Sequence, residues 1–280
     1  MGAGIARSRV SSPAAPRGPV AAAFERRAAR AETLADASEA ASGPLRFAAG
    51  LYRSQGFLVS AIERMHAERP LTGRLREDAE RLVETGGEVF GFAADHGPPL
   101  LADQARARRG EDRSVARDRL LAWWDGGRSS TEDYLSRALL RPYVEVLAHI
   151  AVTPDRVHRS GHCPVCGGAP WIAARRAESG GDGARRSLGC ALCGGEWIIG
   201  RIRCACCAEE DPAKLPSFQS DTYPTARIEA CETCHRYVKS IDLTVDARAL
   251  PEVDDLVSIG MDLWATREGL TRIEPGLAGL

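Results

Sequence analysis

The sequence predicts an α+β protein: a helical N-terminal domain, a small β-rich domain with two rubredoxin-like or zinc-ribbon-like four-cysteine knuckle modules, and a closing C-terminal helix. Apolar residues recur at helical spacing as far as Val152, and beyond Pro154 short β-type runs alternate with turns that carry Gly and Cys. All nine cysteines lie between Cys163 and Cys234. We therefore expect a flexible tail at 1–18, a helical domain at 19–153, a metal-binding β domain at 154–246, and a C-terminal helix and tail at 247–280.

The helical domain is expected to contain several amphipathic helices. One is predicted over 46–68, where five apolar side chains recur at helical spacing, and a second over 74–96, with a weak point at two central glycines. A capping box of Ser129 and Glu132 should begin another helix. Pro142 should kink or split that helix, because proline lacks the N–H donor and clashes with the preceding turn.

The β-rich domain and the C-terminal helix follow from a change of periodicity. Three short runs of strand-forming residues lie between turns, and a Gly-rich stretch at 177–185 reads as a mobile hairpin tip. After Asp246 the apolar residues return to helical spacing and form one face. The expected strands cover 196–202, 225–230 and 236–243.

Composition excludes several classes of protein. Lys and Arg total 37 and Asp and Glu total 38, so the net charge of −1 provides no general attraction for nucleic acid or an anionic membrane. No apolar run approaches the roughly 20 residues that span a bilayer. Near the N-terminus the longest apolar stretch, 20–24, is too short for a secretory signal. We therefore expect a cytoplasmic protein that does not contact membranes or nucleic acid.

Eight of the nine cysteines form four C-x-x-C pairs, and the pairs repeat. Cys163 and Cys190 are separated by the same number of positions as Cys204 and Cys231, which indicates one module used twice. In a reducing compartment such pairs favour metal binding over disulfides. The first predicted site comprises Cys163, Cys166, Cys190 and Cys193, and the second comprises Cys204, Cys207, Cys231 and Cys234.

The chemistry of a C-x-x-C turn explains this assignment. The turn places two thiolates on one side of a tight knuckle, and two knuckles supply a tetrahedral four-sulfur cage. Gly167 and Gly194 follow the second cysteine of their pairs and suit the positive φ that such a turn requires. Ala208 and His235 replace that glycine in the second module, so we expect its geometry to be less ideal.

Four thiolates around each metal leave no open position for an activated water, so we expect no enzyme activity. We expect two metal ions, one in each four-cysteine site. Sulfur ligands suit either iron of the rubredoxin type or zinc. Cys206 is left over and its role is open. His162 and His235 flank ligand cysteines and are expected to be exposed or to support the ligands rather than to replace them.

The sequence resembles the formate dehydrogenase accessory protein family, FdhE. The similarity is carried by C-P-V-C-G at 163–167, L-G-C-A-L-C-G-G-E-W at 188–197 and E-A-C-E-T-C at 229–234, and by the segments at 45–51 and 253–258. The resemblance implies a cytoplasmic, non-catalytic biogenesis factor that contacts the catalytic, molybdenum- or tungsten-containing subunit of formate dehydrogenase. It also implies rubredoxin-like iron sites at the eight paired cysteines, and a homodimer.

Asp254 and Asp255 admit two interpretations. They could face the client protein, or they could stabilise the start of the C-terminal helix, where negative charge is favourable.

Two other functions remain open. A zinc-ribbon protein that binds nucleic acid would use arginines near the knuckles, although acidic residues at 209–211 lie beside them. A rubredoxin-like electron carrier would cycle iron between its ferrous and ferric states.

Overall fold

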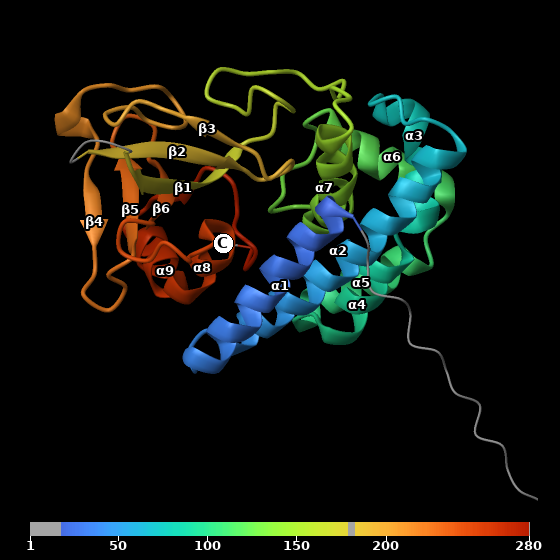
Figure 1. Ribbon diagram of the computed structural model, residues 1–280, viewed down its shortest axis with the longest axis horizontal. Helices are drawn as coiled ribbons and strands as arrows, with labels where there is room; N and C mark the ends of the chain where they lie inside the picture. Colours follow the sequence, from blue (N-terminus) through green and yellow to red (C-terminus); the bar gives the residue numbers. More distant parts are fainter. Residues whose placement is uncertain (1–17, 179–182, 280) are drawn as a thin grey trace, which may run out of the picture.

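A computed structural model describes residues 18–178 and 183–279. The predicted flexible tail at 1–18 lies outside the described residues except for Gly18, and the tip of the predicted hairpin at 179–182 also lies outside them. Figure 1 shows a helical part and a sheet side by side, with the C-terminal helices beneath the sheet. The N-terminal helices are α1 (Pro19–Ala37), α2 (Ser42–Glu68), α3 (Leu75–Thr85), α4 (Gly87–His96), α5 (Pro99–Arg109), α6 (Arg113–Trp124) and α7 (Tyr134–His149).

The fold class is confirmed: helices come first, then a β-rich region with two four-cysteine groups, then C-terminal helices. The long helix α2 packs against α1, α4 and α7. The second predicted helix is divided into α3 and α4 at Gly86, where the sequence indicated a weak point. One continuous apolar core joins the helical part to the sheet, because Trp171 and Ile172 of the sheet belong to the same cluster as Phe24 and Leu51 of the helices.

Pro142 does not split α7, and the reason lies on a neighbouring helix. The helix runs without a break from Tyr134 to His149. A proline at 142 deprives the carbonyl oxygen of Ala138 of its usual i+4 donor. The side-chain amide of Gln55 on α2 donates to that oxygen at 2.8 Å instead. A buried acceptor is thereby satisfied from outside the helix.

The capping box at Ser129 and Glu132 forms, but not at the helix start. The Ser129 N–H donates to the Glu132 carboxylate at 2.8 Å, and the Glu132 N–H donates to the Ser129 hydroxyl oxygen at 3.3 Å. These bonds close a turn that precedes α7. The helix itself is capped by Asp133, whose carboxylate accepts from the Ser136 N–H at 2.9 Å.

The sheet consists of two copies of one three-stranded unit. Its strand order is β3-β2-β1-β6-β5-β4, with β7 beside β6, and the two units meet at the parallel pair of β1 and β6. Shifted by the spacing from Cys163 to Cys204, β2 falls on β5 and β3 falls on β6. The repeat read from the cysteines is therefore a repeat of strands as well. The strands are β1 (Pro170–Ala177), β2 (Ala184–Cys190), β3 (Glu196–Ile198), β4 (Ser217–Gln219), β5 (Ala226–Cys231), β6 (Arg236–Asp242) and β7 (Thr271–Arg272).

The strand predicted at 196–202 is shorter than expected. It ends at Ile198, and the carbonyl oxygens of Gly200 and Arg203 then accept hydrogen bonds from the Arg186 guanidinium at 3.1 and 2.9 Å. These two carbonyl oxygens therefore receive their hydrogen bonds from a side chain rather than from a neighbouring strand. The strands predicted at 225–230 and 236–243 agree with β5 and β6 to within one residue at each end.

Buried ion pairs connect the helical part to the C-terminal segment. Arg27 on α1 contacts Glu145 on α7 at 2.9 Å, and Arg141 contacts the same carboxylate at 2.8 Å. Both arginines also pair with Glu252 at the start of α8 (Pro251–Asp254). Burial opposes ionisation of Glu252, but the charges of Arg141 and Arg27 outweigh it and lower its pKa to about 2. The charges therefore compensate one another across the contact between the two parts, and we call this group the interdomain ion cluster.

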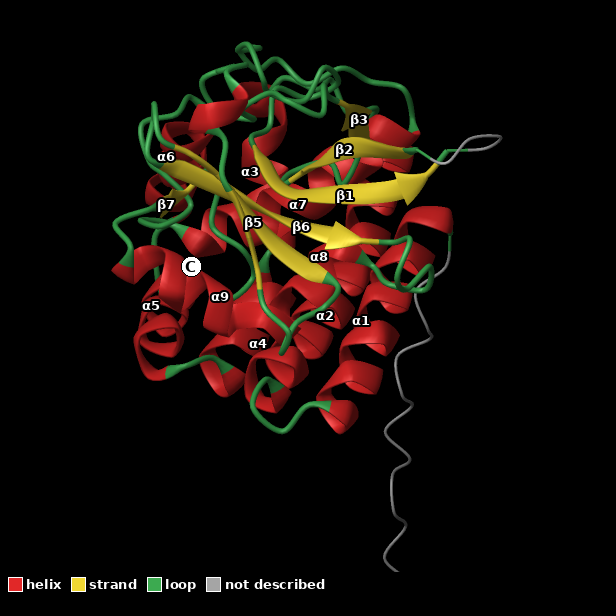
Figure 2. Cartoon of the chain, turned by 90° about the vertical axis from the view of Figure 1, so that its left-hand side faces the viewer, coloured by secondary structure: helices red, strands yellow, loops and turns green. Residues whose placement is uncertain are grey.

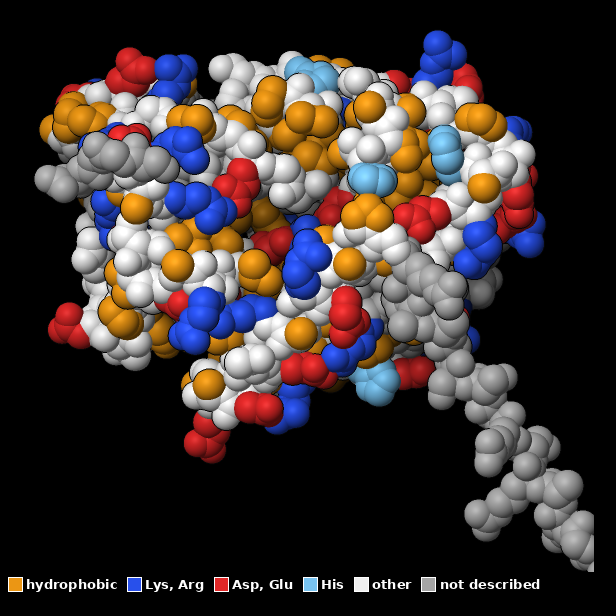
Figure 3. All heavy atoms as spheres, viewed as in Figure 1, with side chains coloured by type: hydrophobic (Ala, Val, Ile, Leu, Met, Phe, Trp, Pro, Cys, Tyr) orange, Lys and Arg blue, Asp and Glu red, His pale blue; other side chains and the backbone are white. Residues whose placement is uncertain are grey.

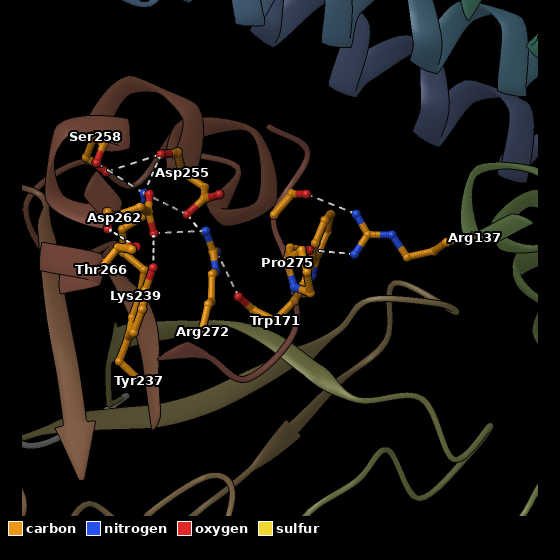
Figure 4. Close-up of polar contacts among 11 residues, drawn as sticks. Arg137, Trp171, Tyr237, Lys239, Asp255, Ser258, Asp262, Thr266, Arg272 and Pro275 are labelled. Atoms are coloured by element: carbon orange, nitrogen blue, oxygen red, sulfur yellow. Dashed lines mark hydrogen bonds and ion pairs between the residues drawn. The ribbon is translucent and has the colours of Figure 1, made fainter. Parts of the chain in front are cut away.

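A second buried polar group lies between the sheet and the C-terminal helices (Figure 4). The ammonium group of Lys239 is fully buried and pairs with Asp262 and, at 3.1 Å, with Asp255. Arg272 contacts Asp255 at 2.9 Å and Asp262 at 3.2 Å. The Tyr237 hydroxyl donates to Asp262 at 2.9 Å.

This group decides between the interpretations of Asp254 and Asp255. Asp255 is 4% exposed and held by internal cations, so the first interpretation, in which it faces a client protein, is wrong. Asp254 is the last residue of the short helix α8, but its carboxylate pairs with Arg30 and accepts from the Leu250 N–H at 2.8 Å, so the charge lies at the start of that helix. The second interpretation, stabilisation of a helix start, holds for Asp254.

The C-terminal helix predicted as one element is divided into three. A 3-10 turn (Asp255–Ser258) separates α8 from α9 (Ile259–Arg267). Within that turn the carbonyl oxygens of Asp255 and Ser258 accept hydrogen bonds from the Lys239 ammonium at 2.9 and 3.2 Å. These oxygens point at a buried cation instead of continuing a regular helix, which accounts for the interruption.

The Gln55 contact generates a test by double-mutant cycle. Gln55→Met should lower the free energy of unfolding by about 1–3 kcal/mol, because it leaves the Ala138 carbonyl without a donor. In a Pro142→Ala background the cost should fall, since that substitution restores the backbone N–H that bonds this carbonyl. Urea unfolding would measure both values, with Gln104→Met on the exposed face of α5 as the control. An equal cost in the two backgrounds would contradict the explanation.

Candidate metal centres

The first four-cysteine group is assembled by two knuckles that flank the hairpin of β1 and β2. The Sγ atoms of Cys163 and Cys193 are 3.6 Å apart, and those of Cys166 and Cys190 are 3.4 Å apart. All four sulfurs lie within 4.8 Å of one another, and all four residues are buried. The group could hold one metal ion.

The second group has the same construction around β4, β5 and the start of β6. The Sγ atoms of Cys204 and Cys234 are 3.8 Å apart, and those of Cys207 and Cys231 are 3.6 Å apart. Its four sulfurs also lie within 4.8 Å of one another. Unlike the first group it reaches the surface, because Cys207 is exposed and Cys234 is partly exposed.

The sulfur spacing fits tetrahedral coordination. A metal with bonds of about 2.3 Å to four sulfurs separates each pair of sulfurs by about 3.8 Å. The shortest separations in both groups lie between 3.4 and 3.8 Å. The structure therefore gathers the eight predicted cysteines into the two predicted sets, each compact enough for one ion.

Backbone N–H groups are directed at the sulfurs. In the first group the N–H groups of Leu192 and Cys193 donate to Cys190 Sγ at 3.3 and 3.4 Å. In the second group those of Cys206 and Cys207 donate to Cys204 Sγ at the same distances. Such bonds stabilise negative charge on sulfur, so the turn itself favours thiolates.

All four knuckles turn through a residue in the left-handed region. Gly167 and Gly194 have φ of 66° and 67°, and Ala208 and His235 at the matching positions have φ of 63° and 54°. The expected difference in geometry is therefore absent: the second module keeps the same turn with residues that adopt it at a cost. That cost is about 1–2 kcal/mol per residue for a side chain other than glycine.

The first group lies against the interdomain ion cluster and an aromatic pair. A Cβ on Gly194 would lie 2.9 Å from Arg27 Nη2 and 3.2 Å from Glu145 Oε1, so the knuckle packs directly on that cluster. On another side the Arg156 guanidinium lies over the rings of Trp123 and Trp124, at 5.3 and 5.0 Å from their centroids. Burial lowers the pKa of Arg156, and the nearby sulfurs of Cys166 and Cys190 oppose that shift.

No local pattern marks these supporting groups in the sequence. Arg27, Glu145 and Arg156 come from three separate elements, and only the tertiary fold brings them to the cysteines. Trp123 and Trp124 are both buried.

The second group is supported by a single carboxylate. Glu209 accepts from the Thr233 hydroxyl at 2.6 Å and so connects the two knuckles, while the backbone N–H groups of Glu210 and Asp211 donate to its other oxygen at 3.1 Å. These bonds, the Thr233 hydroxyl first, lower the pKa of Glu209. Glu209 therefore has a structural role in joining the two halves of the second module.

The remaining candidates lie outside the two sulfur groups. The Cys206 side chain is exposed and contributes only its backbone N–H to the second group. His162 Nδ1 lies 3.1 Å from the carbonyl oxygen of Gly167, beside the first knuckle. His235 is exposed and occupies the left-handed turn position.

A cation between the sulfurs of each group would stabilise them as thiolates. Burial raises the pKa of the Cys190 and Cys204 thiols, whereas hydrogen bonds from Cys166 and Cys190 hold that of Cys163 well below its usual value. Four full negative charges at these separations would repel one another strongly. A bound metal ion would remove that repulsion.

Comparisons with known proteins agree with this architecture. A family model described as "FdhE, C-terminal domain" matches residues 202–277, which include the second cysteine group and the C-terminal helices. The protein FdhE homolog of Pseudomonas putida is 29% identical over 92% of this chain and 88% of its own length, and that of Aquifex aeolicus is 25% identical over 72% and 71%. The chain is therefore similar to FdhE proteins over most of its length.

A solved FdhE structure has the same fold. The crystal structure of the FdhE protein from Pseudomonas aeruginosa matches with a TM-score of 0.62 and 23% identity, covering 93% of this chain and 97% of that chain. The correspondence with FdhE therefore extends over the helical part as well as over both cysteine modules.

The described residues contain no helix that is both long enough and apolar enough to cross a membrane. Side chains of both charge signs are interspersed over the face of the molecule seen in Figure 3, in keeping with a net charge of −1.

The left-handed turn residues generate a test. Ala208→Gly and His235→Gly should each raise the free energy of unfolding of the metal-loaded protein by about 1 kcal/mol, because glycine adopts positive φ without strain. Gly167→Ala should lower it by more than that, since the new Cβ would also lie 2.7 Å from the Val157 carbonyl oxygen.

Urea unfolding would measure the three effects, and Gly43→Ala is the matched control. Gly43 lies in α2 with open space around its Cβ position, so that variant should be neutral or slightly stabilising. Lower stability after Ala208→Gly and His235→Gly would show that these turns are not strained.

Proposed function

We propose that this chain is an accessory factor in the biogenesis of formate dehydrogenase. In this proposal it binds the catalytic, molybdenum- or tungsten-containing subunit in the cytoplasm during maturation or assembly. Similarity to FdhE homologues over most of the chain supports the role. The observation that carries it furthest is the pair of four-sulfur groups on a fold shared with FdhE along almost the whole chain.

The eight paired cysteines are proposed as the ligands of two metal ions, iron or zinc. Cys163, Cys166, Cys190 and Cys193 would hold one ion, and Cys204, Cys207, Cys231 and Cys234 the other. A metal in such a site supplies folding energy, of order 10 kcal/mol in zinc-finger peptides at neutral pH. Each ion would fasten the two ends of one hairpin.

A non-catalytic role follows from the coordination. Four sulfurs around one ion leave no position at which a substrate or an activated water could bind. In this proposal the protein binds its client as a homodimer and does not turn over a substrate.

A second candidate function rests on the exposure of the second group. Electron transfer needs a redox-active metal near the surface, and Cys207 is exposed while every residue of the first group is buried. A rubredoxin-like electron carrier would use the second group for exchange and the first for structure.

Client binding can be tested by affinity capture. The tagged protein, expressed without oxygen in a host that makes formate dehydrogenase, should retain the catalytic subunit of that enzyme, identified by mass spectrometry. Cys190→Ser should abolish the capture and reduce the metal content by one ion per chain. The substitution removes one of the four sulfurs of the first group, which packs against the interdomain ion cluster.

Cys206→Ser is the control, since that sulfur lies outside both groups, and it should retain both client and metal. Wild-type capture by Cys190→Ser would separate the metal group from the accessory role. No formate dehydrogenase subunit above background with the wild-type protein would overturn the proposed function.

The electron-carrier function predicts a spectroscopic signal. Protein loaded with iron should show iron–thiolate absorption that bleaches on reduction and returns on oxidation. Cys207→Ser should alter the band of the second group and leave that of the first. Absorption that does not respond to a reductant would exclude the carrier.

A further inference from the structure

A cavity of about 220 Å³ opens beside the second cysteine group, on the face of the sheet away from the C-terminal helices. Along β6, Tyr237 and Lys239 point to those helices, so Arg236 and Val238 point to the opposite face, where the cavity lies. Figure 2 shows the strands of this sheet in front of the helices. Six arginines line the cavity: Arg175, Arg186, Arg201, Arg203, Arg227 and Arg236.

Four of the six arginines come from the four long strands of the sheet, and Arg201 and Arg203 come from the loop after β3. Arg175 on β1 lies directly opposite Arg186 on β2 in the strand register, and Arg227 and Arg236 come from β5 and β6. Like charges placed opposite each other weaken a strand pair. The sheet therefore carries a concentration of positive charge that its own stability does not require.

The carboxylates nearby are too few to neutralise this charge. Glu229 is committed to Arg186, at 2.6 Å, and Asp242 is shared between Arg227 at 2.8 Å and Arg175 at 3.5 Å. Arg203 pairs with Glu210 at 2.7 Å, and Arg201 lies at 4.0 Å from Glu178. Among residues 18–178 and 183–279, Arg236 has no carboxylate within ion-pair distance.

The cavity also has an apolar side, which strengthens charge interactions within it. Ala205, Val238 and Ile273 line it and form a small apolar cluster separate from the main core. Burial lowers the pKa of Arg227, and the neighbouring charge of Arg175 lowers it further. An anion that entered would meet guanidinium groups that are partly removed from water and repel one another.

We propose that this cavity binds a phosphate or diphosphate group, either as the free ion or as part of a larger molecule. Guanidinium groups match phosphate oxygens in pairs of parallel hydrogen bonds, and a partly open cavity of this size accommodates one or two phosphate groups. A nucleic acid would need a continuous open track for its backbone rather than a single cavity. The proposal does not depend on the role in formate dehydrogenase biogenesis.

Another interpretation has to be separated from this one. A metal bound by four thiolates carries net negative charge, and the arginines could serve only to compensate it at the second group. Cys204 lines the same cavity. In that case Arg236→Gln would speed the loss of metal, and the protein would not bind phosphate.

The test uses the full-length, metal-loaded protein and isothermal titration with inorganic phosphate, diphosphate and ADP. Diphosphate should bind, and Arg236→Gln and Arg227→Gln should each raise its Kd about tenfold or more. Arg267→Gln, an exposed arginine on α9 across the sheet, is the matched control and should leave the Kd unchanged. Equal Kd values for diphosphate and ADP identify the free group as the ligand, whereas tighter ADP binding indicates a larger phosphorylated molecule.

Three outcomes would overturn the proposal. They are the absence of heat with all three ligands at millimolar concentration, equal weakening by Arg267→Gln and Arg236→Gln, and faster loss of metal in Arg236→Gln without any phosphate binding. Stronger binding of single-stranded oligonucleotides than of diphosphate would point to nucleic acid instead. Arg236 is exposed and has no ion pair among the described residues, so its replacement should leave the fold intact.

Discussion

The relative position of the two parts of this molecule depends on charges that are buried between them. Arg27 and Arg141 are 8% and 3% exposed, and both require the carboxylates of Glu145 and Glu252 to remain charged in that environment. Two of these residues come from α7, one from α1 and one from α8, so every pair except Arg141–Glu145 within α7 forms only when these three helices come together. Removing one partner from such a group is costly because an uncompensated charge stays behind. The contact therefore specifies one arrangement of helices and sheet rather than a range of them.

The two cysteine groups are alike in geometry and unlike in surroundings because of that arrangement. The first is enclosed between the interdomain ion cluster and the Arg156–tryptophan stack, and its sulfurs belong to the main apolar core. The second lies at the half of the sheet formed by β4, β5 and β6, where Glu209 is its principal polar support. An ion in the first group would be protected from water and chelators, and an ion in the second would exchange more readily. Any difference between the two groups in holding an ion would follow from position, since both offer four cysteine sulfurs.

The sequence was sufficient to predict the cysteine sets and the order of the parts. Both depend on local patterns: C-x-x-C spacing, helical periodicity and the change from helical to strand-like periodicity near Pro154. The predictions failed where a distant residue decides the local structure. Pro142 does not split α7 because Gln55 supplies the missing donor, and Lys239 interrupts the C-terminal helix by attracting two of its carbonyls. Ala208 and His235 adopt the turn of a glycine because the sulfur group dictates it, which residue preference alone does not reveal.

The two units of the sheet are related head to tail, and this geometry has a consequence for assembly. The contact joins β1, the first strand of the first unit, to β6, the last strand of the second unit. The two units therefore use different edge strands for it. Such a heterologous contact does not close on itself and could in principle add further units without limit. The counterparts of the two joining strands are β3 and β4 at the outer edges, and each has only three residues. Short edge strands are poor templates for pairing with another chain. The outer strand of each unit is thus shorter than its counterpart in the middle of the sheet. Short strands at both outer edges hinder the addition of further strands.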